Sequence, residues 1–143
     1  MTDRPSIVVI GSVNLDIVAT ADRLPLAGET VTGAELNRFP GGKGGNQALA
    51  AKRLGADVSL VACVGKDSNA NDALALLRDG GVDLSCCSTT DAAATGVALI
   101  AVALSGENQI VVAPGANREL RSDKIAMPVA DALICQLEVP SAT

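Results

Sequence analysis

The sequence contains no histidine, tryptophan or tyrosine, and Phe39 is its one aromatic residue. Because aromatic side chains are the platforms on which nucleic-acid bases stack, we expect no nucleic-acid binding. The four cysteines, Cys63, Cys86, Cys87 and Cys135, lack Cys-x-x-Cys spacing and no histidine complements them, so we expect no zinc site. A disulfide between the adjacent Cys86 and Cys87 stays open as an alternative to free thiols, although it would be strained.

Long apolar runs and clustered positive charge are also missing. No apolar run reaches the roughly 18 residues that a membrane-spanning helix needs. The formal net charge is −5, and the acidic residues are scattered, which does not suit binding to a phosphate backbone. The polar start at residues 1–6 lacks the apolar core of a signal peptide. We therefore expect a cytoplasmic protein that contacts no membrane.

Hydrophobic residues make up 48% of the chain, and most of them are alanine, valine, leucine or isoleucine. Small and β-branched side chains pack well between parallel strands and helices, so the composition favours an α/β fold. A length of 143 residues suits one domain, covering residues 1–143.

Predicted strands and helices alternate along the chain. Apolar runs predict strands at residues 6–12, 17–21, 31–39, 58–64, 97–104, 109–113 and 131–136. Helices are predicted at residues 44–54 and, capped by Ser68 or Asn69, up to residue 79, with a short one near Ser122. This alternation predicts a Rossmann-like parallel sheet with flanking helices. The strands at about 15–39 and 95–113 do not fit it, so we expect them in a small separate sheet.

Asn14 and Asp16 follow the first predicted strand, at the sheet edge where open α/β folds bind ligands. They are two residues apart, so in an extended segment their side chains share a face. An amide and a carboxylate together offer the donors and acceptors that hold adjacent hydroxyl groups. An Asx turn leaving the strand explains the same two residues equally well.

Four glycines surround Lys43 in the segment GGKGGN at residues 41–46, which opens the first predicted helix. Glycine lets a ligand approach the backbone, and free N–H groups at a helix start favour oxygen atoms. The segment is not a P-loop, because Gly44 rather than Ser or Thr follows the lysine, and the turn after the first strand lacks GxGxxG. We interpret Gly42, Lys43 and Asn46 as ligand contacts, with a solvated side chain as the alternative for Lys43.

Glu138 follows the last predicted strand and so reaches the same edge of the sheet. Its carboxylate is suited to accept a hydrogen bond from a polyol hydroxyl, and the alternative is a solvated loop acid. The convergence of three polar clusters on one edge favours a binding site there. Asn117 has no assignment from its sequence context alone.

These motifs resemble those of a known family. The segment PGGKGGNQALAAKRLGADVSLVACVGKD at residues 40–67 resembles the first signature of the ribokinases and of the wider PfkB family of carbohydrate and nucleoside kinases. Three further segments resemble parts of ribokinases: GSVNLDIVATADRLPLAGETVTG, TGVALIAVALSGENQIVVAPGAN and ALICQLEVP. The resemblance runs in order through nearly the whole chain.

The resemblance implies a ribokinase-like fold with a β lid at about 15–39 and 95–113, and ATP-dependent phosphorylation of D-ribose at its 5-hydroxyl. The cofactors it implies are ATP, Mg²⁺ and a monovalent cation such as K⁺, and the lid strands would also form a homodimer interface. Each site residue carries over by matching position. Asn14 and Asp16 would bind sugar hydroxyls, Gly42, Lys43 and Asn46 would contact the sugar from the helix start, and Glu138 would contact it from the last strand. Gly45 stands where alanine is common, a change that we expect to be tolerated.

The family's second signature has no counterpart in the 143 residues. That signature is a Gly-Ala-Gly-Asp segment with an anion hole and the catalytic aspartate, whereas Gly55-Ala56-Asp57 lacks the second glycine. We therefore expect an amino-terminal half that holds the sugar, has no catalytic residue or metal ligand, and is inactive alone. Two alternatives stay open: a sugar-binding or dimerising module without catalysis, and a kinase for another sugar or a nucleoside.

Overall fold

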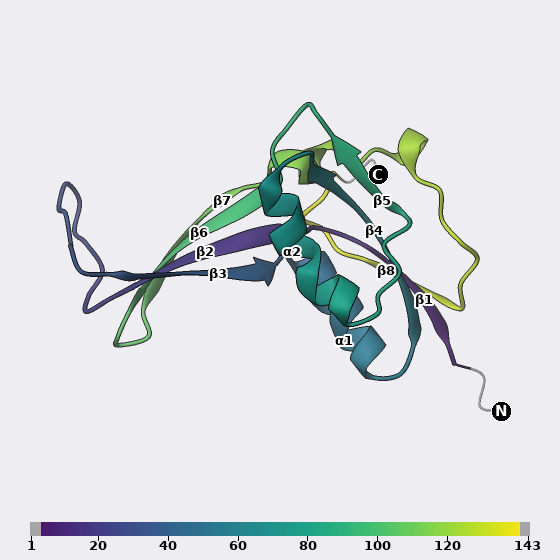
Figure 1. The fold of residues 1–143 in the computed structure, drawn as a ribbon, viewed down its shortest axis with the longest axis horizontal. Coiled ribbons are helices and arrows are strands. Elements are labelled where there is room, and N and C mark those ends of the chain that lie inside the picture. Colours follow the sequence, from purple (N-terminus) through teal and green to yellow (C-terminus); the bar gives the residue numbers. More distant parts are fainter. Residues whose placement is uncertain (1–3, 141–143) are drawn as a thin grey trace.

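The computed structural model describes residues 4–140. Strand β1 (Ser6–Ile10) lies inside the sheet on which the helices pack. β1 lies between β4 (Asp57–Gly65) and β8 (Ala132–Cys135) and is parallel to both. β5 (Cys87–Thr90) adds a fourth parallel strand beside β4. We call this sheet, in the order β5-β4-β1-β8, the main sheet (Figure 1). The predicted parallel sheet is thus confirmed.

Two helices cover one face of the main sheet, α1 (Lys43–Arg53) and α2 (Ser68–Asp79) (Figure 1). Their buried residues recur every three or four positions, as in Ala70, Ala73, Leu74 and Leu77 of α2, so each helix has one apolar stripe. The opposite face is covered by the 3₁₀ helix η1 (Gly115–Glu119) and the segment after it. Side chains of β1 alternate between the two faces, so the strand is buried on both sides.

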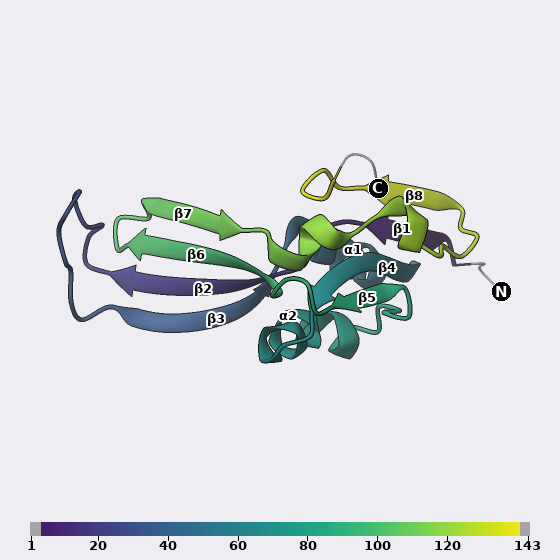
Figure 2. The same ribbon diagram turned by 90° about the horizontal axis from the view of Figure 1, so that it is seen from above.

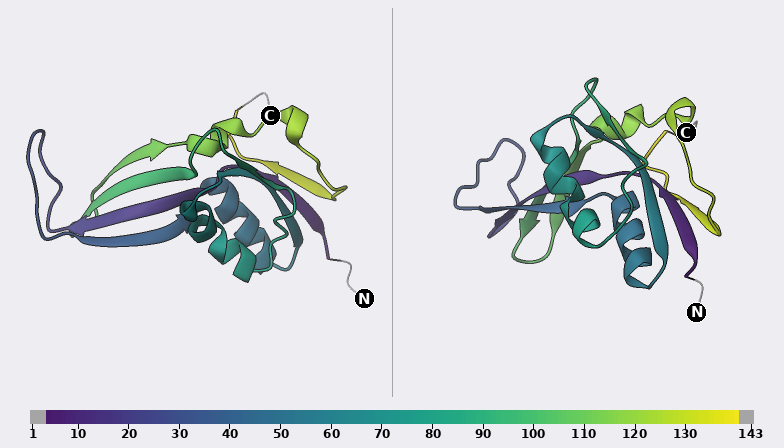
Figure 3. Two further views of the ribbon diagram at one scale, coloured as in Figure 1. Left: turned by 45° about the horizontal axis from the view of Figure 1, so that its top comes forward. Right: turned by 45° about the vertical axis from the view of Figure 1, so that its right-hand side comes forward.

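A second sheet extends away from the helices (Figures 2 and 3), and we call it the side sheet. It consists of β2 (Asn14–Ala21), β3 (Glu35–Gly41), β6 (Gly96–Ala103) and β7 (Asn108–Ala113), in the order β3-β2-β6-β7. β2 is antiparallel to β3 and parallel to β6, and β6 and β7 form a hairpin. Two predicted boundaries differ: the strand expected at 17–21 begins at Asn14, and the one expected at 31–39 spans Glu35–Gly41.

The prediction that Ser68 or Asn69 caps α2 is wrong, because the cap is Asp67. Its Oδ1 accepts a hydrogen bond from the backbone N–H of Ala70 at 3.0 Å. The same carboxylate accepts bonds from the backbone N–H and the hydroxyl of Thr95, at 2.8 and 2.7 Å. A carboxylate has enough lone pairs for all three donors, so Asp67 links the start of α2 to the start of β6.

Some local features differ from the predictions or were not predicted. Neither β5 nor η1 was expected, and the short helix near Ser122 is one 3₁₀ turn, η2 (Ser122–Lys124).

All four cysteines are free thiols, and burial raises the pKa of Cys87 to about 12, which keeps it protonated at neutral pH. Between residues 4 and 140, no helix combines the length and apolar character needed to cross a membrane.

Candidate functional site

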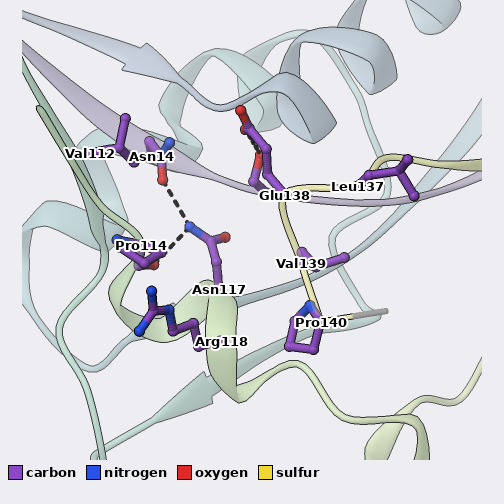
Figure 4. A pocket seen from close by; sticks show the side chains of 10 residues that line it. Asn14, Val112, Pro114, Asn117, Arg118, Leu137, Glu138, Val139 and Pro140 are labelled. Carbon is purple, nitrogen blue, oxygen red and sulfur yellow. Dashed lines mark hydrogen bonds between the residues drawn. The ribbon is translucent and has the colours of Figure 1, made fainter. Parts of the chain in front are cut away.

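A pocket of about 680 Å³ lies between the two sheets, beyond the carboxyl ends of β1 and β8 (Figure 4). This is the edge at which open parallel sheets bind ligands. Two residues of the expected site, Asn14 and Glu138, line it. The remaining lining residues are Ser12, Val112, Pro114, Asn117, Arg118, Leu137, Val139 and Pro140.

Asn14 begins β2 and is 6% exposed. Its Oδ1 accepts a hydrogen bond from Nδ2 of Asn117 at 2.8 Å, and both amides face the pocket region (Figure 4). The Asx-turn alternative does not describe this arrangement, because the partner of the Asn14 side chain lies 103 residues further along the chain. Asn14 is therefore fixed by tertiary contacts.

Asp16 lies two residues further along β2 and is half-buried. Its carboxylate occupies the space that a Cβ on Gly41 would fill, so glycine at this position of the neighbouring strand lets Asp16 keep its place. Burial raises the pKa of Asp16, and the negative charge of Glu138 raises it further. In the part of the chain that the structure describes, no donor or cation pairs with this carboxylate, which leaves its oxygen atoms free to accept from a ligand.

Glu138 and Lys43 form an ion pair, with 2.7 Å between Lys43 Nζ and Glu138 Oε1. The hydroxyl of Ser12 donates to the other oxygen, Oε2, at 2.9 Å. The hydrogen bond from Lys43 is the main reason why the pKa of Glu138 lies below its ordinary value. The predicted meeting of these segments at one sheet edge is therefore seen for Lys43 and Glu138, which contact each other directly.

The glycines at the start of α1 bring the helix against the segment that joins β1 to β2. Gly42 is the N-cap with φ 91°, a conformation that favours glycine. A Cβ there would lie 2.7 Å from the backbone nitrogen of Asn14, and one on Gly44 would lie 2.6 Å from the backbone nitrogen of Ser12. Asn46 is exposed and lines a separate small crevice with residues of α2; it is not among the residues that line the larger pocket.

Three polar or charged pocket residues were not predicted from the sequence as site residues: Ser12, Asn117 and Arg118. Ser12 is 1% exposed and holds Glu138, while Asn117 is 1% exposed and holds Asn14. Their partners are more than 100 residues away in the sequence, so no local pattern marks them. Arg118 is an exposed cation on the pocket wall and comes directly after Asn117 in η1.

The pocket offers hydrogen bonds to a neutral polar molecule. It combines one free carboxylate nearby at Asp16, one neutralised carboxylate at Glu138 and one side-chain amide at Asn14. Between residues 4 and 140, no group of three or more Cys, Asp or Glu side chains is arranged to hold a metal ion. The carboxylates and the amide at the pocket can accept from and donate to hydroxyl groups.

Comparison with known proteins gives consistent results. The sequence profile described as "pfkB family carbohydrate kinase" matches residues 4–142. The ribokinase of Haemophilus influenzae is 39% identical over 142 residues, which cover 96% of this chain and 46% of that protein. A ribokinase structure from Thermotoga maritima superposes with a TM-score of 0.87 at 34% identity, covering 96% of this chain and 47% of the other.

The structure of Arabidopsis thaliana ribokinase complexed with ribose and ATP superposes with a TM-score of 0.81 at 31% identity, covering 98% of this chain and 47% of that one. The fold similarity thus extends over nearly all of the present chain. At the same time, the chain spans about half the length of the curated relatives it matches.

Proposed function

Because this chain belongs to the pfkB family of carbohydrate kinases, we propose that it supplies the sugar-binding part of a ribokinase, which transfers a phosphoryl group from ATP to the 5-hydroxyl of D-ribose. The relatives that match nearly all of it are named ribokinases. A relative from Arabidopsis thaliana is described in complex with ribose and ATP. The proposed sugar contacts are Asn14, Asp16, Gly42, Lys43, Asn46 and Glu138.

The observation that carries this proposal is the free carboxylate of Asp16 beside the pocket amide of Asn14. Keeping a half-buried carboxylate without a partner costs stability, and its raised pKa expresses that cost. Hydroxyl groups of a sugar would remove the cost by donating to Asp16, while the Asn14 amide serves a neighbouring hydroxyl. A neutral polyol fits this set of groups better than an anion would.

Between residues 4 and 140, no cluster of three or more Cys, Asp or Glu side chains is arranged to hold a metal ion. We therefore assign no step of phosphoryl transfer to these residues. Their role in the proposal is to bind and orient the sugar. In phosphoryl transfer, positioning the attacking hydroxyl supplies a large part of the rate enhancement.

Sugar binding can be tested directly on the 143-residue chain by isothermal titration calorimetry with D-ribose, D-fructose and adenosine. We expect ribose to bind, and Asp16→Asn to weaken it about tenfold because one charge-assisted hydrogen bond is lost. Asp22→Asn is the matched control, since Asp22 is an exposed residue that follows the same strand outside the pocket. Equal ribose affinity of Asp16→Asn and the native chain, or preference for another ligand, would contradict the assignment.

Turnover requires a protein with a complete kinase site. We suggest a chimera in which residues 1–140 replace the matching part of Haemophilus influenzae ribokinase, assayed for ADP release with the same three ligands. We expect turnover with ribose, and its loss in the Asp16→Asn chimera but not in Asp22→Asn. Ribose binding by the chain without turnover in a folded chimera would instead favour a binding module.

We further propose that the side sheet serves as a lid over the sugar and as a homodimer interface. It is a sheet with an open edge at β7, and every residue of β7 is exposed. Apolar residues are displayed on it, including Leu99 at 51% and Val111 at 67% exposure. A patch of this kind outside the core is typical of protein–protein contacts.

The dimer can be tested by analytical ultracentrifugation of Val111→Lys. We expect the native chain to sediment as a dimer and the variant as a monomer, because a lysine there would be buried without a partner. Leu54→Lys is the control, since Leu54 is 89% exposed at the end of α1, far from the side sheet's open edge. A monomeric native chain, or equal dimerisation of both variants, would refute this part.

A further inference from the structure

Asn117 lies at the point where the side sheet returns to the main sheet, and both the oxygen and the nitrogen of its side-chain amide are hydrogen-bonded. Its Oδ1 accepts from the backbone N–H of Val13 at 2.9 Å. Its Nδ2 lies 3.1 Å from the carbonyl oxygen of Val13, 3.0 Å from that of Pro114 and 2.8 Å from Asn14 Oδ1. With 1% exposure, this amide has no contact with bulk water.

The backbone groups around Asn117 determine which way its amide points. An N–H group can only donate, so the atom facing Val13 N must be the oxygen. Carbonyl oxygens can only accept, so the atom facing Val13 O and Pro114 O must be the nitrogen. The orientation of Asn117 therefore follows from backbone chemistry and needs no assumption about Asn14.

This orientation in turn determines how Asn14 is oriented. Because Asn117 presents a donor, Asn14 must turn its oxygen towards it, and its own Nδ2 then points away. Among residues 4–140, no acceptor pairs with Asn14 Nδ2, and no buried side-chain nitrogen or oxygen lacks a partner. The free nitrogen is therefore reached from the pocket that Asn14 lines.

Gly96 gives independent support for this arrangement. It pairs with Asn14 in the side sheet, and a Cβ at Gly96 would occupy the space of Asn14 Oδ1 and Asn117 Nδ2. Any other residue would separate the two amides. The strand opposite Asn14 thus leaves room for this one hydrogen bond.

We propose that Asn117 is a positioning residue that makes Asn14 a hydrogen-bond donor towards the ligand. This inference rests on the proposed function, in which the ligand is a sugar. The two carboxylates at the site, Asp16 and Glu138, can only accept when ionised, whereas a sugar hydroxyl both donates and accepts. Asn14 supplies the donor that complements them, so a hydroxyl oxygen accepts from Asn14 while another hydroxyl donates to a carboxylate.

The orientation can be measured by NMR on the ¹⁵N-labelled chain, without any ligand. Signals of the two side-chain amides are assigned by their disappearance in Asn14→Asp and Asn117→Asp. We expect slow hydrogen exchange for the buried Asn117 amide and fast exchange for that of Asn14. Slow exchange at Asn14 with fast exchange at Asn117 would overturn the inference, whether or not ribose binds.

The role in binding can be measured by a double-mutant cycle, with ribose titrated into the native chain, Asn14→Ala, Asn117→Asp and the double variant. In Asn117→Asp the nitrogen that donates to Asn14 is lost, so we expect Asn14 to lose its fixed orientation and ribose affinity to fall about tenfold. If Asn117 acts through Asn14, the double variant binds no more weakly than Asn14→Ala alone. Additive losses would show a general structural effect and refute the proposal.

Thr95→Val is the matched control, because Thr95 is 2% exposed and its side chain is hydrogen-bonded to Gly65 and Asp67 and not to Asn14 or Asn117. We expect it to lower stability and leave ribose affinity unchanged. Absence of ribose binding in the native chain would refute the proposed function, while the exchange measurement would still decide how Asn14 is oriented. If Asn117→Asp does not fold, that measurement on the native chain remains decisive.

Discussion

Gly44 and Gly45 are neighbours in the first turn of α1, and replacing each by alanine should change stability in opposite directions. A Cβ on Gly45 would lie 3.4 Å from Leu77 Cδ1 and 3.9 Å from Val13 Cγ2, which are ordinary contacts with apolar atoms. A Cβ on Gly44 would lie 2.5 Å from the carbonyl carbon of Gly11 and 2.6 Å from Ser12 N. These are backbone atoms, so the clash is relieved only if α1 moves away from the end of β1.

The magnitude follows from two terms. Both substitutions restrict the unfolded chain and favour helix, which is worth about 0.5–1 kcal/mol. Gly45→Ala keeps this gain, so its melting temperature should rise by about 2–4 °C for a chain of this size. Gly44→Ala has the same gain but adds the cost of overpacking, about 1–3 kcal/mol. Because the first term is common to both, the difference between the variants is the steric cost at Gly44 plus the gain from packing the new methyl at position 45 against Leu77 and Val13.

The assay is urea unfolding of the native chain and both variants, followed by far-ultraviolet circular dichroism because the chain has no tryptophan. Gly45→Ala should have the highest free energy of unfolding and Gly44→Ala the lowest. Ribose titration adds a second readout, since Gly44→Ala should also displace the pocket segment at Ser12. A Gly44→Ala variant as stable as the native chain would refute the close approach on which the site geometry depends.

Two carboxylates give opposite predictions for stability against pH. Burial and Glu138 raise the pKa of Asp16, so its ionised form is less favourable in the folded chain than in the unfolded chain. Asp16→Asn should therefore unfold at a higher urea concentration than the native chain at neutral pH. This gain in stability should fade as the pH falls towards the ordinary pKa of 3.8. Equal urea midpoints of the two proteins at neutral pH would contradict the prediction. For Asp67, burial opposes the shift, but hydrogen bonds from Thr95 and Ala70 outweigh it and lower the pKa. The ionised Asp67 therefore stabilises the folded chain above pH 3.8, its ordinary pKa, and this stabilisation is lost as the pH falls through the lowered pKa. Asp67→Asn should cost more stability at neutral pH than in acid. A loss of stability that does not change with pH would refute this.

Features that depend on local sequence could be predicted. The strands β1 and β4 are continuous apolar runs, and α1 and α2 are apolar-periodic segments that end near glycine, so each was found within about two residues. Strand β5 reads Cys-Ser-Thr-Thr, which has neither an apolar run nor alternation. It is a strand because β4 offers it a parallel edge, and that edge exists only in the folded chain.

For the site, the residue types were predicted but not their pairing. Glycine and polar residues after strands indicated where a ligand would bind, and Asn14 and Glu138 do line one pocket. The sequence could not show that Lys43 and Glu138 bind each other, since they are 95 positions apart. It also could not show that Asn46 lines the crevice beside α2, because this depends on how α1 is rotated against the sheet.

The strand order of the main sheet has a consequence for synthesis on the ribosome. One of the two partners of β1, β8, begins 126 residues after β1 does, so β1 leaves the ribosome long before this partner. Until residues 132–135 are available, one edge of β1 has unpaired backbone groups and can pair with other chains. Glu138 follows β8 directly, so its contacts with Ser12 and Lys43 form only once this last strand has docked. We therefore expect the pocket to form only after residues 132–138 have left the ribosome and β8 has docked beside β1.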